Sequence, residues 1–204
     1  MASGQNSAQR DTAEPIMNLI GQKIALGPLQ RELLPYYQRW MNDADVNALR
    51  IYTLRPMTWE AVEVWYEQVS KEMNLDAAFF TIYERSTTRP IGLTMLLDIA
   101  FLNKSAEFAI SIGEKDCWHK GYGTETTRLM LDYAFRVVGL HSVRLRTLSF
   151  NTRAIHVYEH VGFQHAGIWR EAHPFEGKLH NIVLMDCLAR DFFMFDGQQE
   201  KTIS

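Results

Sequence analysis

The sequence lacks the features that would direct it to a membrane or to an oxidising compartment. No run of about 18 apolar residues occurs, so no segment is typical of a membrane-spanning helix. Only two cysteines are present, Cys117 and Cys187, without metal or redox spacing, and we expect two buried free thiols. The opening residues, MASGQNSAQRDTAEP, contain no apolar signal segment. These absences predict a soluble, cytoplasmic protein.

The sequence also has little net charge. It contains 21 basic and 24 acidic residues, for a formal net charge of -3, and no basic run. A nucleic-acid or anionic-membrane partner would require a concentration of positive charge, so we expect neither. At 204 residues the chain is long enough for one domain with a full core. We expect a polar N-terminal tail over residues 1–20, one domain over 21–195 and a C-terminal tail over 196–204.

Hydrophobic periodicity in the first half predicts helices followed by strands. The segment KIAL is typical of a strand, and GPLQRELLPYYQRWMND has apolar residues at helical spacing. A second amphipathic helix follows, with Thr58 as its N-cap. The segments FFTIY, IGLTMLLDI and SAEFAISI then predict an antiparallel meander.

The second half predicts two further helices and three strands. TETTRLMLDYAFRVVG is typical of a long helix with Gly139 at its end, and VRLRTLSF of a strand. Asn151 is expected to cap a short helix that Gly162 ends. HAGIWREA and NIVLMDCL predict two last strands, joined by the loop HPFEGKLH. There is no internal repeat and no linker.

Strand alternation gives one carboxylate special interest. In SAEFAISI, Phe108, Ile110 and Ile112 share one face, which leaves Glu107 on the opposite face with its neighbours Ala109 and Ser111. A carboxylate therefore projects from a central strand of the predicted sheet.

The stretch HKGYGTET, from His119 to Thr126, is typical of an anion-binding turn. Two glycines precede a predicted helix, where unpaired backbone N–H groups and the helix dipole favour a phosphate. The lysine precedes the first glycine, which excludes a Walker A loop, and no third glycine completes a dinucleotide-binding fingerprint. A tight strand-to-helix turn without a ligand is the structural alternative.

Three segments together carry a family resemblance: CWHKGYGTET with its helix, LSFNTRAIHVYEHVGF, and GIWREAHPFEGKLHNIVLMDCL. In this order they resemble the GNAT acetyltransferase superfamily, in the branch of the ribosomal-protein alanine and spermidine acetyltransferases, over about residues 22–193. The resemblance implies a single α+β domain of the GNAT fold. Its sheet would be mixed and mostly antiparallel, with about six to seven strands and about four flanking helices. One departure is Trp118, which stands where the superfamily usually has Gln or Arg.

The resemblance implies acetyl-coenzyme A (acetyl-CoA) as co-substrate and no metal. Backbone N–H groups from about Trp118 to Thr124 would meet its pyrophosphate, and Gly121 and Gly123 would allow the close approach. The residues expected at the cofactor are Ile110, Ser111, Ile112, Trp118, His119, Lys120, Gly121, Tyr122, Gly123, Thr124, Asn151 and Ala154.

Acetyl transfer to an amine requires removal of a proton. An alkylammonium has a pKa of about 10.4, so only about one molecule in 2,500 is neutral at pH 7, a handicap of roughly 4.6 kcal/mol. Glu107 is our candidate for the base, directly or through water, with a plain salt bridge as its alternative. The resemblance assigns the oxyanion to a backbone N–H near Ile110 to Ile112 and makes Tyr158 the general acid for the departing thiolate.

The acceptor is less defined by the sequence. The resemblance places Glu171, His173, Glu176 and His180 in the acceptor pocket, and a solvated loop is the alternative. We expect an N-acetyltransferase for a small primary amine, such as a polyamine, an amino sugar or an amine antibiotic, acting in a ternary complex. The alternatives are a peptide N-terminus as acceptor, as in a ribosomal-protein-type enzyme, or a non-catalytic CoA-binding regulator. A homodimer is possible.

Overall fold

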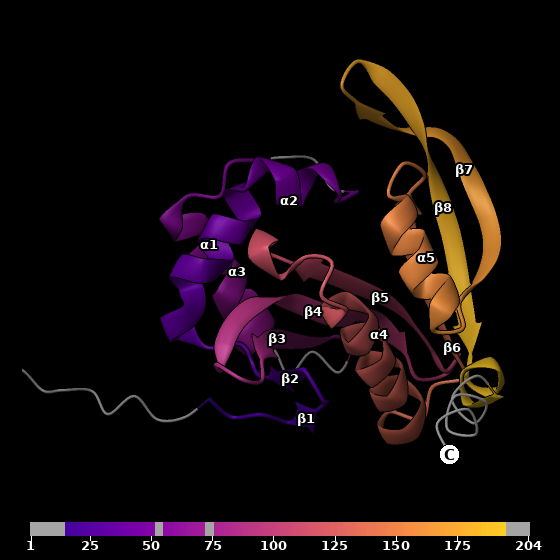
Figure 1. The fold of residues 1–204 in the computed structure, drawn as a ribbon, viewed down its shortest axis with the longest axis horizontal. Helices are drawn as coiled ribbons and strands as arrows, with labels where there is room; N and C mark the ends of the chain where they lie inside the picture. Colours follow the sequence, from indigo (N-terminus) through magenta and orange to yellow (C-terminus); the bar gives the residue numbers. More distant parts are fainter. Residues whose placement is uncertain (1–14, 52–54, 72–75, 195–204) are drawn as a thin grey trace, which may run out of the picture.

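The computed structural model describes residues 15–51, 55–71 and 76–194, which form one α+β domain. Its centre is an eight-stranded sheet in the order β1-β2-β3-β4-β5-β6-β8-β7, slightly larger than the six to seven strands expected (Figure 1). The strands are β1 (Leu19–Ile20), β2 (Ile24–Gly27), β3 (Ala78–Glu84), β4 (Arg89–Ala100), β5 (Ser105–Ile112), β6 (Ser142–Leu148), β7 (Gln164–Phe175) and β8 (Lys178–Leu188).

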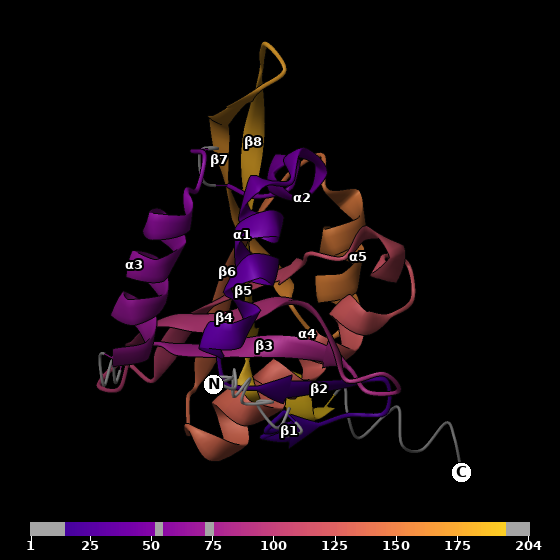
Figure 2. The same cartoon turned by 90° about the vertical axis from the view of Figure 1, so that its left-hand side faces the viewer.

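Helices lie on both sides of this sheet, as the two views show (Figures 1 and 2). The α-helices are α1 (Leu34–Asn42), α2 (Ala44–Ala48), α3 (Trp59–Lys71), α4 (Tyr122–Asp132) and α5 (Thr152–His160). A 3-10 turn (Arg31–Leu33) precedes α1, another (Lys115–Cys117) precedes the glycine turn, and α4 continues as a π-helical turn (Tyr133–Val137). Among the described residues, none of the helices has the length and apolar character to cross a bilayer.

The sheet is antiparallel except where β5 meets β6. These two strands run parallel and pair only over Ser105–Glu107, opposite Ser142–Arg144. β4, on the other side of β5, stays paired along the strand as far as the Gly92 and Ile112 partners. Beyond Glu107, therefore, β5 separates from β6 while remaining attached to β4, and a gap opens in the middle of the sheet.

Two hydrophobic clusters cover the two faces of the sheet. The smaller joins α1 and α3 to Leu93 of β4, through buried side chains that include Tyr37 and Val62. The larger joins α4 and α5 to the opposite face and includes Phe108, with Ile110 and Ile112 packed against it. Since Leu93 pairs with Ser111, the predicted alternation along β5 is confirmed: Phe108, Ile110 and Ile112 face α4 and α5, and Glu107 faces the other way.

Several local predictions are confirmed. The N–H of Ala61 donates to Thr58 Oγ1 at 3.2 Å, and the N–H of Ala154 donates to Asn151 Oδ1 at 3.3 Å, so both caps form. Gly139 has φ of 77° and Gly162 has φ of 104°, the left-handed conformation expected after a helix. Both cysteines are buried free thiols.

Three features of the secondary structure differ from the expectation. Strand β1 lies inside the predicted tail, because Leu19–Ile20 pair with Leu26 and Ala25 of β2. Helix α2 was not predicted; its signal is Asp43, whose Oδ1 accepts from the N–H groups of Asp45 and Val46. The predicted loop HPFEGKLH is mostly strand, since β7 continues to Phe175 and β8 begins at Lys178.

Candidate active site

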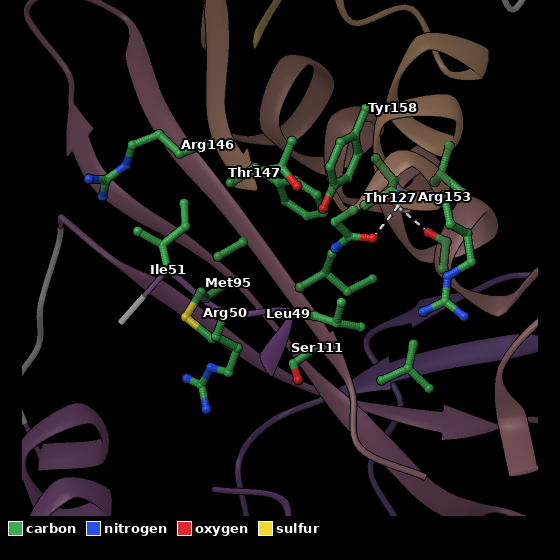
Figure 3. A pocket seen from close by; sticks show the side chains of 18 of the residues that line it. Leu49, Arg50, Ile51, Met95, Ser111, Thr127, Arg146, Thr147, Arg153 and Tyr158 are labelled. Atoms are coloured by element: carbon green, nitrogen blue, oxygen red, sulfur yellow. Dashed lines mark hydrogen bonds between the residues drawn. The ribbon is translucent and has the colours of Figure 1, made fainter. Parts of the chain in front are cut away.

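A cavity of about 210 Å³ lies at the gap between β5 and β6 and connects the two faces of the sheet. One side is formed by the N-terminal half of α4 and by α5, and the other by α2, the residues after it and β4 (Figure 3). Of the residues predicted from the sequence, those that line it are Glu107, Ile110, Ser111, Ile112, Trp118, Gly123, Asn151, Ala154 and Tyr158.

The separation of the strands supplies the hydrogen-bonding groups of this cavity. In a strand that has lost its neighbour, the N–H and C=O groups of alternate residues point into the gap. Residues Phe108 to Ile112 of β5 are in this position, because their pairing with β6 has ended. The geometry is suited to a backbone donor for an oxyanion and to an extended chain that pairs with the strand.

The glycine turn precedes α4 in the conformation that an anion site requires. Gly121 is the N-cap of α4 with φ of 84°, and His119 also has a positive φ, of 62°. The N–H groups of Tyr122, Gly123 and Thr124 are in the first turn of the helix, where no intrahelical acceptor exists. A Cβ at Gly123 would meet nothing within 4 Å, and Gly123 lines the cavity, so space for a ligand lies directly against the backbone.

Two residues of this turn have contacts that differ from the expected cofactor contact. The N–H of Trp118 donates to Lys115 O at 3.1 Å, which removes it from the set of amides that face an anion. The hydroxyl of Tyr122 donates to Glu84 Oε1 at 2.6 Å, so its side chain points to β3. This contact with the carboxylate raises the pKa of Tyr122 to about 12. The backbone N–H of Tyr122 still belongs to the first turn.

A cation that the sequence analysis missed lies beside the turn. Arg153, in the first turn of α5, has its guanidinium carbon 5.0 Å from the centre of the Trp118 ring and its Nη1 3.2 Å from His119 Nε2. The indole N–H of Trp118 donates to Ile112 O at 2.9 Å, which fixes the ring against the end of β5. Arg153 lines the cavity together with Gly123. A cation near a helix N-terminus is electrostatically unfavourable unless an anion compensates for it.

Tyr158 enters the cavity from α5 and is held among aromatic rings. It is 9% exposed, and its ring packs edge-on against Phe108, with centroids 6.3 Å apart, and against Phe163 at 5.8 Å. Burial raises the pKa of Tyr158 to about 12 by disfavouring the phenolate. The hydroxyl is therefore protonated throughout the neutral range and can donate a hydrogen bond.

Glu107 forms the salt bridge that was the alternative to its role as a base. Its side chain is 12% exposed, and its Oε1 accepts from Arg146 Nε at 2.8 Å and Nη2 at 2.7 Å. Arg144 Nε lies 3.9 Å from its other oxygen. Glu107 nevertheless lines the cavity on the face away from the glycine turn.

The four predicted acceptor residues are on the long β7–β8 hairpin, which projects beyond the rest of the sheet (Figure 1). His173 and His180 are cross-strand partners, and the His180 ring lies 4.7 Å from that of Phe150. Glu171 has φ of 51° in a bulge and Glu176 has φ of 49° in the turn. None of the four lines the cavity; their role at the acceptor remains a prediction.

The acceptor side of the cavity is formed instead by residues that sequence reasoning did not single out. They come from α2 and the residues after it, from β4 and from β6, and are Val46, Leu49, Arg50, Ile51, Met95, Leu97, Arg146 and Thr147. The alternation of β6 could have indicated Arg146, since Val143 and Leu145 pack in the larger cluster and the residues that alternate with them, Arg144 and Arg146, must face the other way.

Fold and site together define an acetyltransferase: strands that separate beside a helix N-terminus, with a buried tyrosine at the gap. A family model described as an acetyltransferase (GNAT) domain matches residues 23–164, and the chain belongs to this family. It is an N-acetyltransferase that uses acetyl-CoA. The open cradle at Gly123 and the first-turn amides fit that co-substrate.

Two similar proteins have assigned activities. The chain is 30% identical over 129 residues to a spermidine N(1)-acetyltransferase of Vibrio cholerae, covering 62% of this chain and 73% of that protein. It is 28% identical over 162 residues to a spermidine N(1)-acetyltransferase of Escherichia coli, covering 79% and 84%. A crystal structure of the Vibrio cholerae spermidine N-acetyltransferase, in complex with CoA and spermine, has a TM-score of 0.78 at 23% identity, covering 85% and 99%. The structural likeness supports the GNAT fold.

Proposed function

We propose that the protein transfers the acetyl group of acetyl-CoA to the primary amine of a small molecule, by direct attack in a ternary complex. The observation that carries the proposal is the cavity that passes through the gap between β5 and β6. It has the glycine turn on one face of the sheet and an apolar chamber on the other, so two substrates can meet at the gap.

On the cofactor side, we assign the pyrophosphate to the N–H groups at the start of α4 and to Arg153. The positive end of the helix dipole and the guanidinium both favour an anion. Arg153 supplies the side-chain donor that Trp118 cannot supply, and the Trp118 ring positions it. Lys120 adds a positive charge in the same turn, and the His119 ring lies beside Arg153, with its Nε2 3.2 Å from Arg153 Nη1.

At the reacting centre, the proposed roles belong to the backbone of β5 and to Tyr158. A backbone N–H between Ile110 and Ile112 would donate to the oxyanion. A phenol of pKa about 12 is a weaker acid than a thiol of pKa about 8.5, so complete proton transfer to the thiolate is uphill by about 4.8 kcal/mol. Tyr158 is therefore best suited to donate a hydrogen bond to sulfur as negative charge develops there.

The acceptor ammonium must lose its proton before attack. Glu107 is the carboxylate at the acceptor side of the gap, and we keep it as the proposed base, acting through water because Arg146 contacts its Oε1. A water between the carboxylate and the amine would pass the proton on without breaking the salt bridge.

A screen of acceptors tests the proposal. Release of free thiol from acetyl-CoA is measured with primary amines, polyamines including spermidine, amino sugars, amine antibiotics and N-terminal peptides. Turnover with small amines and not with peptides supports the proposal. Turnover restricted to peptides would replace it with the second candidate, a protein N-terminal acetyltransferase.

A further inference from the structure

The segment 113–118 connects the end of β5 to the glycine turn and also contacts the helices of the acceptor side. It ends at Trp118, whose ring lies under the Arg153 guanidinium on the cofactor side. The helices α1 and α2 lead into Val46, Leu49 and Ile51, which line the acceptor side of the cavity. Direct attack requires the two reacting atoms to lie about 3–3.5 Å apart. Contacts that join the two sides are therefore candidates for positioning residues.

The first of these contacts joins the end of α1 to the start of the segment. The Trp40 ring lies so close to Gly113 that a Cβ at this glycine would collide with it. The indole N–H of Trp40 donates to Glu114 Oε1 at 2.7 Å, and Arg39 donates to the same oxygen. The Glu114 side chain is 15% exposed. Since the backbone N–H groups of Gly113 and Glu114 both donate to Ile91 O, the end of α1 is tied to a segment that is itself held by β4.

The next residue, Lys115, joins the start of α2 to the same segment, and its 3-10 turn lies beside α2 (Figure 1). Its Nζ lies 2.7 Å from Asp45 Oδ2 and 3.0 Å from Asp43 Oδ2. The other oxygen of Asp43 accepts from the N–H groups of Asp45 and Val46 and so caps α2. The backbone O of Lys115 accepts from the N–H of Trp118 at 3.1 Å. One residue thus links the first turn of α2 to the start of the glycine turn.

Helix α2 depends on contacts of this kind for its position. It has five residues, and a helix this short is not stable through its own hydrogen bonds. The Lys115 side chain is 49% exposed and that of Asp43 is 23% exposed. Ion pairs with this exposure contribute little to the stability of a whole domain. Loss of Lys115 should therefore let α2 shift while the domain remains folded.

We infer that Lys115 is a positioning residue for acetyl transfer. Through Asp43 and Asp45 it holds the α2 wall of the cavity at the distance from the cofactor that direct attack requires. Lys115 does not line the described cavity, so it would act through α2 and not by contact with either substrate. It has this role within the proposed function, on which the inference rests.

The variant Lys115→Met tests this role, because it removes the charge and retains an unbranched side chain. Steady-state kinetics are measured with hexylamine, spermidine and glucosamine as acceptors. We expect kcat/KM for the acceptor to fall about 3- to 30-fold, as for the loss of one or two exposed ion pairs. The loss should occur with each amine that the wild type acetylates, because the wall moves whatever the charge of the acceptor. The Kd for CoA, measured by calorimetry, should stay within about twofold of wild type, and the melting temperature should change little.

Two further variants assign the effect to the ion pairs. Lys115→Arg should retain most of the wild-type kcat/KM, since a guanidinium can pair with both carboxylates. Asp45→Asn should cause part of the loss, and the double variant with Lys115→Met should be no worse than Lys115→Met alone. Asp43 is left unchanged because it also caps α2.

The matched control is Arg31→Met. Arg31 is also 49% exposed and also pairs with two carboxylates, those of Glu63 and Glu67. It does not line the described cavity. This variant should leave kcat/KM unchanged for each acceptor, which separates the position of Lys115 from the general loss of a surface ion pair.

The outcomes distinguish this inference from the proposed function. If Lys115→Met acetylates the amines within twofold of wild type, Lys115 has no positioning role, and small-amine acetylation stands. An equal loss of CoA affinity, or a variant that melts early, would also overturn the inference, because Lys115 would then support the cofactor turn or the fold. If the wild type acetylates none of the amines while it acetylates N-terminal peptides, the proposed function falls and the inference falls with it.

Discussion

Replacing Tyr158 with phenylalanine isolates one hydroxyl group. The ring contacts with Phe108 and Phe163 do not depend on that group. Because the side chain is 9% exposed, removing the hydroxyl also removes a desolvated polar atom, which costs little or no stability. We therefore expect the melting temperature to change by no more than about 2–4 °C, which corresponds to about 1 kcal/mol in a protein of this size.

The expected kinetic effect follows from the bond that is lost. A hydrogen bond to a charged group contributes about 1.5–3 kcal/mol, and the charge on sulfur exists only as the thioester breaks. The turnover number should therefore fall about 10- to 150-fold with little change in acetyl-CoA affinity. Because burial raises the pKa of Tyr158 to about 12, the wild-type hydroxyl stays protonated to beyond pH 10 and this loss should be constant from pH 7 to pH 9.

Single-turnover kinetics of thiol release, with calorimetry of CoA binding, measure this effect on the chemical step. Tyr133→Phe is the matched control, since Tyr133 packs on Phe80 at 5.3 Å and does not line the cavity. A Tyr158→Phe variant that retains more than about half of the wild-type turnover would show that Tyr158 is a hydrophobic anchor. The thiolate would then be stabilised by water.

Three further predictions concern the rest of the site. Gly123→Val should weaken CoA binding more than about tenfold by calorimetry while the protein melts normally, because the new side chain would enter open space against the cofactor and not the core; unchanged affinity would contradict the assignment of the turn. Arg153→Gln should weaken CoA binding about 10- to 100-fold, with the same loss for 3′-dephospho-CoA because the contact is to the pyrophosphate. A loss of affinity seen for CoA but not for 3′-dephospho-CoA would show that Arg153 contacts the 3′-phosphate instead. Glu107→Gln should lower the rate at pH 7 and recover part of it near pH 10, where the amine is already neutral; a pH profile parallel to that of wild type would remove Glu107 from proton transfer.

The sequence predicted those features of the structure that depend on neighbouring residues along the chain. Strand β5 was predicted with its final bounds, Ser105–Ile112, because period-two alternation is a property of neighbouring residues. The caps at Thr58 and Asn151 and the turn at Gly121 were found for the same reason: each is a short-range hydrogen bond or dihedral that one residue type favours. The order of the segments was enough to indicate the GNAT fold.

Tertiary structure alone decided how distant segments share the cavity. The end of pairing between β5 and β6 after Glu107 is a matter of register between strands more than thirty residues apart, which no local pattern encodes. The same holds for the salt bridge of Glu107 with Arg146, for Arg153 on the Trp118 ring, and for Arg50 at the far wall. The sequence by itself determined that acetyl-CoA chemistry is possible here. The packing of α2, β4 and β6 around the gap decided which charged side chains an acceptor meets. Contacts between charges depend on their distance in space and not on their separation along the chain.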